Sequence, residues 1–344
     1  RHQGTKEHQA NLGVTWCLGA LVVGTFVMDK IGKYQVIKKL GEGATSVVWL
    51  GHDPFADRDV AIKVVASSVF SGGEHGKIAR NLFVTEASLA GKLVHPHIVQ
   101  IYDAVADADP SYIVMEYVAG GTLEPYCTPD RLLPMVDLVE MIFKCTRALD
   151  FAYRLGVIHR DLKPANILRA GSSGSDVKIS DFGAALSASS DQTAVAGIGS
   201  PAYMSPQQVK DHPLNHQSDI FSLGVVMYQL LTGQLPFQGS NNISIVYQIA
   251  NVEPPPPSAL RKGIPPAVDA IVMRAMKKSL EDRYPTWDAF SFDLAETFRN
   301  EHLEEARERI ADTEKFNTLR GLAFFRDFND VQLWELLGFS DWQR

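Results

Sequence analysis

The chain has 344 residues, is 45% hydrophobic and carries a formal net charge of −7 at pH 7. This length is sufficient for a sizeable core and for two or three domains. The acidic balance argues against nucleic acid as a partner, because that would need a basic surface. Cys17, Cys127 and Cys145 lie far apart and lack metal-site spacing, so they indicate free thiols in a reducing compartment, the cytoplasm.

An uncharged apolar run, NLGVTWCLGALVVGTFVM, occupies residues 11–28. It is slightly short for a membrane span and also has the character of a signal-peptide core. We interpret residues 1–27 as upstream or non-native sequence, because residues 29–43 look like the natural beginning of a soluble domain. A membrane anchor is the alternative, and it would require the rest of the chain to face the cytoplasm.

The pattern from Tyr34 to Tyr117 favours strands, with short β-type runs separated by turn residues. The expected strands cover residues 34–40, 46–52, 59–65, 99–105 and 111–118, and the expected helix covers about 77–92. Apolar spacing typical of helices then appears at 135–154 and 217–232. These patterns predict a small β-rich lobe, a connector near residues 116–121 and a larger α-helical lobe.

One segment, VIHRDLKPANIL at residues 157–168, concentrates polar residues between apolar ends. The ends, residues 157–158 and 167–168, read as short buried strands, and Pro164 rules out a helix through the middle. The polar residues therefore lie on an anchored loop, and loops of this kind often carry chemistry. Taken alone, the segment would also fit a polar surface turn.

Two upstream motifs contain residues suited to phosphate binding. In LGEGATSVV, residues 40–48, Gly41 and Gly43 would let the backbone approach a phosphate chain, although this pattern alone more often marks a hairpin turn. Lys63 ends the expected strand VAIK, where apolar neighbours would pack its stem and aim its amine. Glu86 on the following helix is a natural ion-pair partner, and each of these two charges alone would be an ordinary surface group.

These motifs stand in the order found in the eukaryotic-like protein kinase family, which the sequence resembles from about Tyr34 to Phe298. The resemblance, in particular to the bacterial serine/threonine kinases, rests on GEGATSVV, VAIK, HRDLKPAN, DFG, GSPAYMSPQQ, SDIFSLG and DRYP. It implies an α+β, bilobal protein kinase fold over residues 34–298, with one regulatory helix in the small lobe. It also implies transfer of the ATP γ-phosphate to Ser or Thr of protein substrates, a signalling role, and autophosphorylation, for which a dimer would serve.

The resemblance also assigns roles to the polar residues, because phosphoryl transfer needs positioning and charge neutralisation more than covalent catalysis. Lys63 would hold the α- and β-phosphates, with Glu86 fixing its direction. Asp161 would accept the proton of the substrate hydroxyl and orient that group. Lys163 would lie near the γ-phosphate and offset its charge. These four are the implied catalytic residues.

Asn166 and Asp181 are the implied ligands of Mg²⁺, a hard cation that prefers oxygen, with Mn²⁺ as the alternative ion. Val48, Ala61 and Leu168 would sandwich the adenine. The full set of implied nucleotide-binding residues is Leu40, Gly41, Gly43, Ser46, Val48, Ala61, Lys63, Met115, Glu116, Val118 and Leu168.

The remaining implied roles concern regulation and the hinge, which is the connector near residues 116–121. Met115 occupies the gatekeeper position, and the backbone of Glu116 and Val118 would hydrogen-bond the adenine edge. Asp219 would hold the catalytic loop from below, a structural role. Arg160 suggests control by a phosphorylated activation loop at residues 184–204, although its hydroxyls could merely make the loop flexible. The candidate phosphorylation sites in that loop are Ser187, Ser189, Ser190 and Thr193.

Three positions depart from the family pattern. Ser46 replaces the third glycine of the phosphate loop, which is tolerable because the first two make the closest approach. Gln207 replaces a Glu that pairs with a buried arginine, here Arg283, so we expect a somewhat weaker large lobe and not an inactive enzyme. Ser200 stands where Thr is more common and keeps the hydroxyl that can contact Asp161.

Three other functions compete with an active Ser/Thr kinase. A pseudokinase that serves as a scaffold or binding module has support only from Gln207, since Lys63, Asp161 and Asp181 are all present. A small-molecule phosphotransferase would not need Lys163 or a peptide-substrate platform. A tyrosine kinase is disfavoured by the same lysine, two residues after the catalytic aspartate.

The C-terminal part follows the kinase pattern. Residues 299–315 are heavily charged with a thin apolar stripe, which predicts a connecting helix. Residues 316–344 resemble the opening helices of a cyclic-nucleotide-binding domain, without the β-barrel that would hold the nucleotide. We expect this tail to be an incomplete regulatory domain whose deletion leaves the melting temperature nearly unchanged. The alternative is a C-terminal helix packed on the kinase.

Overall fold

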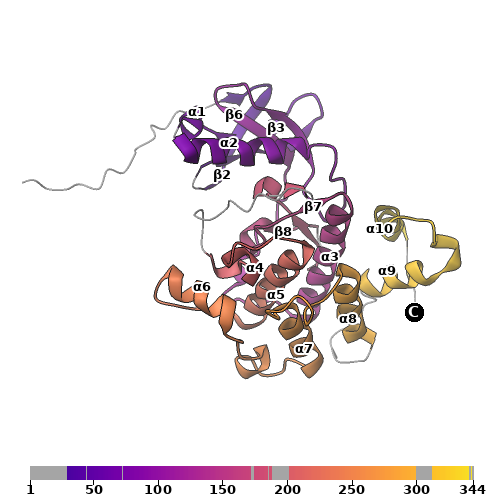
Figure 1. The fold of residues 1–344 in the computed structure, drawn as a ribbon. Helices are drawn as coiled ribbons and strands as arrows, with labels where there is room; N and C mark the ends of the chain where they lie inside the picture. The colour runs from indigo at the N-terminus through magenta and orange to yellow at the C-terminus, as the bar shows by residue number, and fades with distance from the viewer. Residues whose placement is uncertain are drawn as a thin grey trace, which may run out of the picture.

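The computed structural model describes residues 29–43, 45–71, 73–171, 174–184, 186–187, 201–299, 312–340 and 342. Two lobes are stacked, with a sheet in the upper lobe and helices in the lower one (Figure 1). This is the bilobal α+β arrangement that the sequence predicts. The apolar segment 1–27, most of the expected connecting helix, Ser189, Ser190, Thr193 and Ser200 lie outside the described residues.

The N-terminal lobe is a six-stranded antiparallel sheet in the order β1-β2-β3-β4-β6-β5. Apolar residues alternate along β4, so Val60, Ile62 and Val64 pack with Val114 of β6 on one face. The strands are β1 (Lys30–Ile31), β2 (Tyr34–Glu42), β3 (Val47–Asp53), β4 (Arg58–Val65), β5 (Ile101–Val105) and β6 (Ser111–Glu116).

A short helix α1 (Ser67–Phe70) and the longer α2 (Gly73–Ser88) follow β4 and lie across the sheet (Figure 1). Helix α2 packs through Phe83 onto the sheet. It begins and ends four residues earlier than the expected helix 77–92. Its C-terminal side turns at once, because Gly91 has a φ of +72°, a conformation that glycine adopts without strain.

The C-terminal lobe is built around α3 and α5, both almost fully buried. Their bounds agree with the predicted helices 135–154 and 217–232. Its helices are α3 (Met135–Arg154), α4 (Pro206–Val209), α5 (His216–Thr232), α6 (Asn242–Asn251), α7 (Pro266–Ala275) and α8 (Trp287–Arg299). Its short strands are β7 (Val157–Ile158), β8 (Ile167–Arg169), β9 (Val177–Ile179) and β10 (Leu186–Ser187), with β7 paired to β10 and β8 to β9.

The C-terminal tail forms α9 (Asp312–Gly321) and α10 (Asp330–Phe339), which lie beside α3 and α8 (Figure 1). Four of its apolar side chains are buried in the main core of the C-lobe: Phe316, Leu319, Leu333 and Trp334. The structure therefore favours the alternative of a tail packed on the catalytic domain. Helix α9 itself extends across the expected boundary at residue 315.

Two buried histidines near the tail make the stability of the fold depend on pH. Burial lowers the pKa of His95 to about 3, opposed by Asp330 and reinforced by Arg147 and Lys178. Burial also lowers the pKa of His97 well below its ordinary value, reinforced by His95, Lys144 and Lys178 and opposed by a hydrogen bond to the Val177 carbonyl. Both imidazoles are therefore neutral in the native state near pH 6.

We predict that the free energy of unfolding falls as the pH drops below about 6.5, the pKa of an unperturbed histidine. In that range each histidine takes up a proton in the unfolded chain but stays neutral in the native chain. The free energy of unfolding therefore falls by roughly 1.4 kcal/mol per pH unit for each histidine that is fully protonated in the unfolded state. Urea unfolding between pH 7.5 and 5.5 measures the slope. A His97→Gln variant should show a shallower dependence, and an equal slope in both proteins would contradict the assignment.

Among the described residues, no helix is both long enough and apolar enough to cross a membrane.

Candidate active site

The loop 159–166 is held from below by a single buried carboxylate. Asp219, in the first turn of α5, accepts the backbone N–H of His159 at 2.7 Å and that of Arg160 at 2.8 Å. Arg160 has a φ of +68°, an unfavourable conformation for a residue with a side chain, and these two hydrogen bonds help to maintain it. The side chain of Gln208 supports the same turn by donating to the Arg160 carbonyl at 2.9 Å.

Asp161 stands at the open side of this loop with its side chain 44% exposed. Its carboxylate accepts from Lys163 Nζ at 2.7 Å. Asn166 Nδ2 donates to the Asp161 backbone carbonyl at 2.8 Å and approaches its carboxylate at 3.3 Å. These bonds orient the Asn166 amide and leave its Oδ1 available to a ligand. Asp161, Lys163 and Asn166 thus form one hydrogen-bonded unit.

A second unit joins β4, α2 and the segment after β9. Lys63 Nζ lies 2.7 Å from Glu86 Oε2 and 2.9 Å from Asp181 Oδ1, so one ammonium bridges two carboxylates. Burial would lower the pKa of Lys63, but the two carboxylates together raise it above its ordinary value. Burial would raise the pKa of Asp181, but Lys63 holds it below its usual range. The group therefore presents an ionised Asp181 at neutral pH.

The segment of residues 181–183 lies close to Glu86 of α2. Asp181 has a φ of +63°, and the ring of Phe182 packs on the His159 ring with centroids 4.5 Å apart. A Cβ at Gly183 would lie 3.2 Å from Glu86 Oε2, so a side chain there would crowd the ion pair. Glycine thus leaves room for the close approach of α2 to this segment.

The oxygen donors of this site fit a magnesium ion. Asp181 offers a carboxylate and Asn166 an amide oxygen, the hard ligands that Mg²⁺ prefers. No cluster of three or more His, Cys, Asp or Glu residues forms a metal site within the described ranges. The two residues alone cannot complete the coordination of the ion, so phosphate oxygens and water would supply the other ligands.

Most of the expected nucleotide-binding residues lie on strands of the N-terminal lobe, and Leu168 lies on β8 of the C-terminal lobe. Ala61 of β4 pairs with Met115 of β6, and Leu168 forms an isolated bridge with Thr122 beyond the hinge. The phosphate loop closes on itself, with the Gly43 N–H donating to the Ser46 carbonyl at 2.8 Å. Leu40, Gly41 and Val48 lie on β2 and β3, the strands on either side of that loop.

The hinge has one backbone donor already used and one unused. The Glu116 N–H donates to the Gln100 carbonyl at 2.8 Å, so this residue can offer only its carbonyl to a ligand. The Glu116 carboxylate is turned to Lys178, 3.0 Å away. No hydrogen bond within the described part of the chain uses the Val118 N–H. It is therefore free to donate to an adenine edge.

Comparison with known proteins agrees with this geometry. Residues 34–291 match the family described as "Protein kinase domain". The chain belongs to the protein kinase family.

This chain has relatives in bacteria. It is 38% identical over 275 residues to the serine/threonine-protein kinase PknB of Mycobacterium leprae, covering 76% of this chain and 42% of that protein. It is 35% identical over 304 residues to PknB of Mycobacterium tuberculosis (85% and 47%). It is 34% identical over 286 residues to the serine/threonine-protein kinase PrkC of Bacillus subtilis (83% and 43%). The chain thus spans less than half the length of each of these relatives.

The kinase domain keeps the contact between Gln207 and Arg283 that the sequence predicts. Gln207 Oε1 accepts from both terminal nitrogens of Arg283 at 3.2 Å. The fully buried guanidinium otherwise bonds only backbone carbonyls of residues 217, 277 and 278 within the described chain. Because no carboxylate neutralises it, burial lowers the pKa of Arg283 to about 10.

We predict that Gln207→Glu stabilises the C-lobe by about 1–3 kcal/mol, since a hydrogen bond between two charged groups is stronger than one to a neutral amide. Urea unfolding at pH 7.5 of the variant and the parent protein measures the difference. Gln208→Glu on the same short helix is a control for added charge, and it should destabilise because it loses the bond to the Arg160 carbonyl. Equal or lower stability of Gln207→Glu would show that the added charge does not outweigh the lost hydrogen bond from Gln207 Nε2 to the Lys278 carbonyl.

Sequence reasoning missed the supporting role of Gln208. The signal was present in the run SPQQ, since Ser205 and Gln208 form a capping box at the start of α4. The capping bond leaves the Gln208 amide nitrogen free to reach the catalytic loop.

Proposed function

We propose that the chain is a serine/threonine protein kinase that transfers the γ-phosphate of ATP to Ser or Thr hydroxyls of proteins. The observation that carries the proposal is the bridge from Lys63 to both Glu86 and Asp181. Phosphoryl transfer requires this ion pair and the aspartate to be in position at the same time. The similarity to proteins named serine/threonine kinases supports the same activity.

The nucleotide would lie between the lobes. Val48 and Ala61 above and Leu168 below would enclose the adenine, Met115 would stand at the back, and the hinge N–H of Val118 would donate to it. Lys63 would bind the α- and β-phosphates. The Gly41 and Gly43 backbone would close over the phosphates, with Leu40 and Ser46 at the ends of that loop.

The transfer step needs orientation and charge balance more than a strong base. Asp161 would accept the proton of the substrate hydroxyl and aim its oxygen. Lys163, held 2.7 Å from that carboxylate, would offset the charge of the moving phosphate. Asn166 and Asp181 would hold Mg²⁺, or Mn²⁺ in its place, which neutralises phosphate charge when bound. In this proposal no group of the chain forms a covalent bond to the phosphate.

Three further features belong to the proposal. Phosphate on the activation loop would pair with Arg160 and raise activity. A dimer would permit trans-autophosphorylation. Use of ATP would require the catalytic domain to lie in the cytoplasm.

The test is incubation of the purified chain with γ-labelled ATP and Mg²⁺ or Mn²⁺, alone and with a generic Ser/Thr-containing protein. We expect phosphoserine and phosphothreonine, mapped by mass spectrometry. A Lys63→Met variant, which cannot bridge the two carboxylates, should incorporate no label. Folded protein that binds ATP and transfers nothing would favour the pseudokinase, and phosphotyrosine as the main product would overturn the assigned specificity.

A further inference from the structure

The C-terminal tail contacts β9, the strand that leads to Asp181, by two separate routes. The first passes through Lys144 of α3, whose side chain is fully buried. Its Nζ lies 2.9 Å from Asp312, the first residue of α9, and 2.6 Å from Asp176, the residue before β9. The Asp312 N–H also donates to Glu140 of α3 at 3.0 Å. One buried cation thus joins the tail to the start of β9.

The second route passes through His97, in the segment between α2 and β5. The Trp334 ring of α10 meets the His97 ring edge to face, with centroids 4.6 Å apart. His97 in turn contacts β9 at both ends: its Nδ1 lies 3.0 Å from the Val177 carbonyl, and its own carbonyl accepts from the Ile179 N–H at 2.9 Å. The tail therefore packs against a residue that contacts both end residues of β9.

Both routes end close to the active site. Ile179 is two residues from Asp181, the carboxylate held by Lys63. The segment that holds His97 also follows α2, which carries Glu86. Movement of β9 would therefore shift Asp181 relative to the lysine and to the metal that we assign to it.

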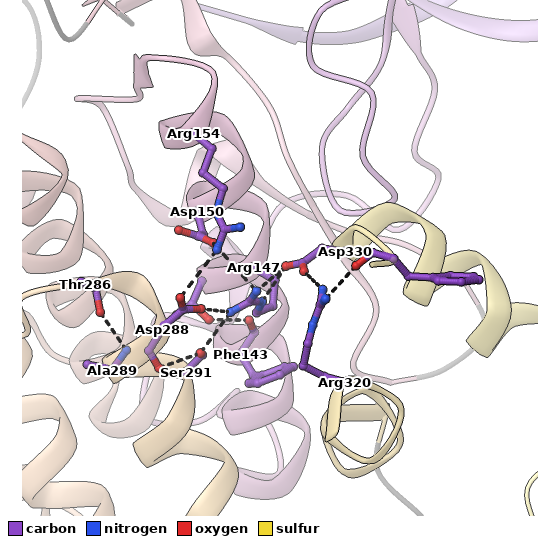
Figure 2. Close-up of polar contacts among 12 residues, drawn as sticks. Phe143, Arg147, Asp150, Arg154, Thr286, Asp288, Ala289, Ser291, Arg320 and Asp330 are labelled. Carbon is purple, nitrogen blue, oxygen red and sulfur yellow. Dashed lines mark hydrogen bonds and ion pairs between the residues drawn. The ribbon is translucent and has the colours of Figure 1, made fainter. Parts of the chain in front are cut away.

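A third contact fixes the tail in place but does not reach β9. Arg147 of α3 donates to Asp330 at the start of α10, through Nε at 3.0 Å and through a terminal nitrogen, and to Asp288 of α8 at 2.6 Å (Figure 2). Arg320 of α9 also bonds Asp330, so the two tail helices are tied to each other at the same carboxylate (Figure 2). These Arg147 contacts hold the tail on the C-lobe independently of the two routes that lead to β9.

We propose that Trp334 and Asp312 are positioning residues for phosphoryl transfer: docked on the C-lobe, the tail holds β9 and so places Asp181 for metal and phosphate binding. The proposal rests on the proposed kinase function. A rigidly held β9 restricts the movement of Asp181, two residues after the strand ends, to the narrow range that a magnesium site requires. Undocking of the tail would leave Asp181 in the site but less well held.

The experiment compares Trp334→Ala and Asp312→Asn with Phe339→Ala in the full chain. Phe339 lies on the same helix as Trp334 but is 92% exposed, so its loss should change nothing. Amide hydrogen exchange of residues 177–181 is measured without nucleotide, and binding of a non-hydrolysable ATP analogue is titrated against Mg²⁺. We expect faster exchange in this segment and a higher Mg²⁺ requirement, each by about 2-fold to 30-fold, the range for coupling between packed elements.

A conservative replacement separates positioning from stability. Trp334 Nε1 is buried without a hydrogen-bond partner in the described structure, so Trp334→Phe keeps the ring contact and loses no bond. It should restore the Mg²⁺ requirement that Trp334→Ala raises. If Trp334→Ala fails to fold, Asp312→Asn carries the test, because Lys144 retains Glu140 and Asp176.

Two results would overturn the proposal. One is unchanged exchange at 177–181 and unchanged Mg²⁺ dependence in both variants, with only a lower melting temperature; the tail would then be a structural element alone. The other is faster exchange spread evenly over the C-lobe, including α5. Neither measurement needs catalytic turnover, so failure of the proposed kinase activity would appear separately, as absence of phosphate transfer by the parent chain.

Discussion

Replacement of Asp161 by Asn is expected to lower phosphate transfer by about 10²-fold to 10⁴-fold, the usual contribution of a positioned general base. The amide cannot accept the proton of the substrate hydroxyl, and it loses the charge that holds Lys163. Nucleotide affinity should change little, because binding depends on Lys63, the glycine loop and the hinge. Initial rates with a Ser-containing peptide and titration with an ATP analogue measure the two effects.

Asp107→Asn, at an exposed loop position, is the matched control and should retain full activity. A folded Asp161→Asn protein that loses nucleotide affinity together with activity would show that the carboxylate holds the nucleotide. Retention of activity would remove Asp161 from the catalytic residues altogether.

Deletion of the C-terminal tail from residue 312 onward is expected to lower the melting temperature by roughly 10 °C or more. The deletion removes four buried apolar side chains from the core, and each contributes about 1.5–3 kcal/mol when fully buried. It also leaves Arg147 with Asp288 and Asp150 but without Asp330. A loss of about 1 kcal/mol lowers the melting temperature of a domain near this size by ~2–4 °C.

Scanning calorimetry of the full and truncated chains measures the shift. Phe339→Ala in the full chain is the control and should have little effect, since this side chain is 92% exposed. An unchanged melting temperature would restore the interpretation of the tail as the start of a separate domain. That the tail resembles the opening helices of a cyclic-nucleotide-binding domain stays a prediction in either case.

The sequence alone was sufficient for the parts of this protein that depend on local pattern. The apolar spacing of 135–154 and 217–232 is long and regular, so it predicted α3 and α5 to within a residue. The loop VIHRDLKPANIL carries its anchors, its proline and its polar residues within one short segment. Its two expected strands appear in the structure for that reason, and a short 3₁₀ turn, Pro164–Asn166, precedes the second of them.

Boundaries set by distant contacts were less predictable. The expected helix 77–92 was displaced by four residues, because its C-terminal end is decided by the turn at Gly91 and by packing of Phe83 on the sheet. Glu86 was nevertheless correctly predicted to lie on this helix. Its pairing with Lys63 requires only that the helix cross the sheet. Helical patterns identify an element more reliably than they locate its ends.

Only the tertiary structure decided the place of the C-terminal tail. Its aromatic residues require a covering surface, but their spacing does not say which one, and a missing domain was as consistent with them as the C-lobe. The answer depends on partners far away in the chain: Arg147 meets Asp330 across 183 positions and Lys144 meets Asp312 across 168. Burial of a charge or a ring is favourable only where a complementary group already lies, and that group is brought into place by the fold of the whole domain.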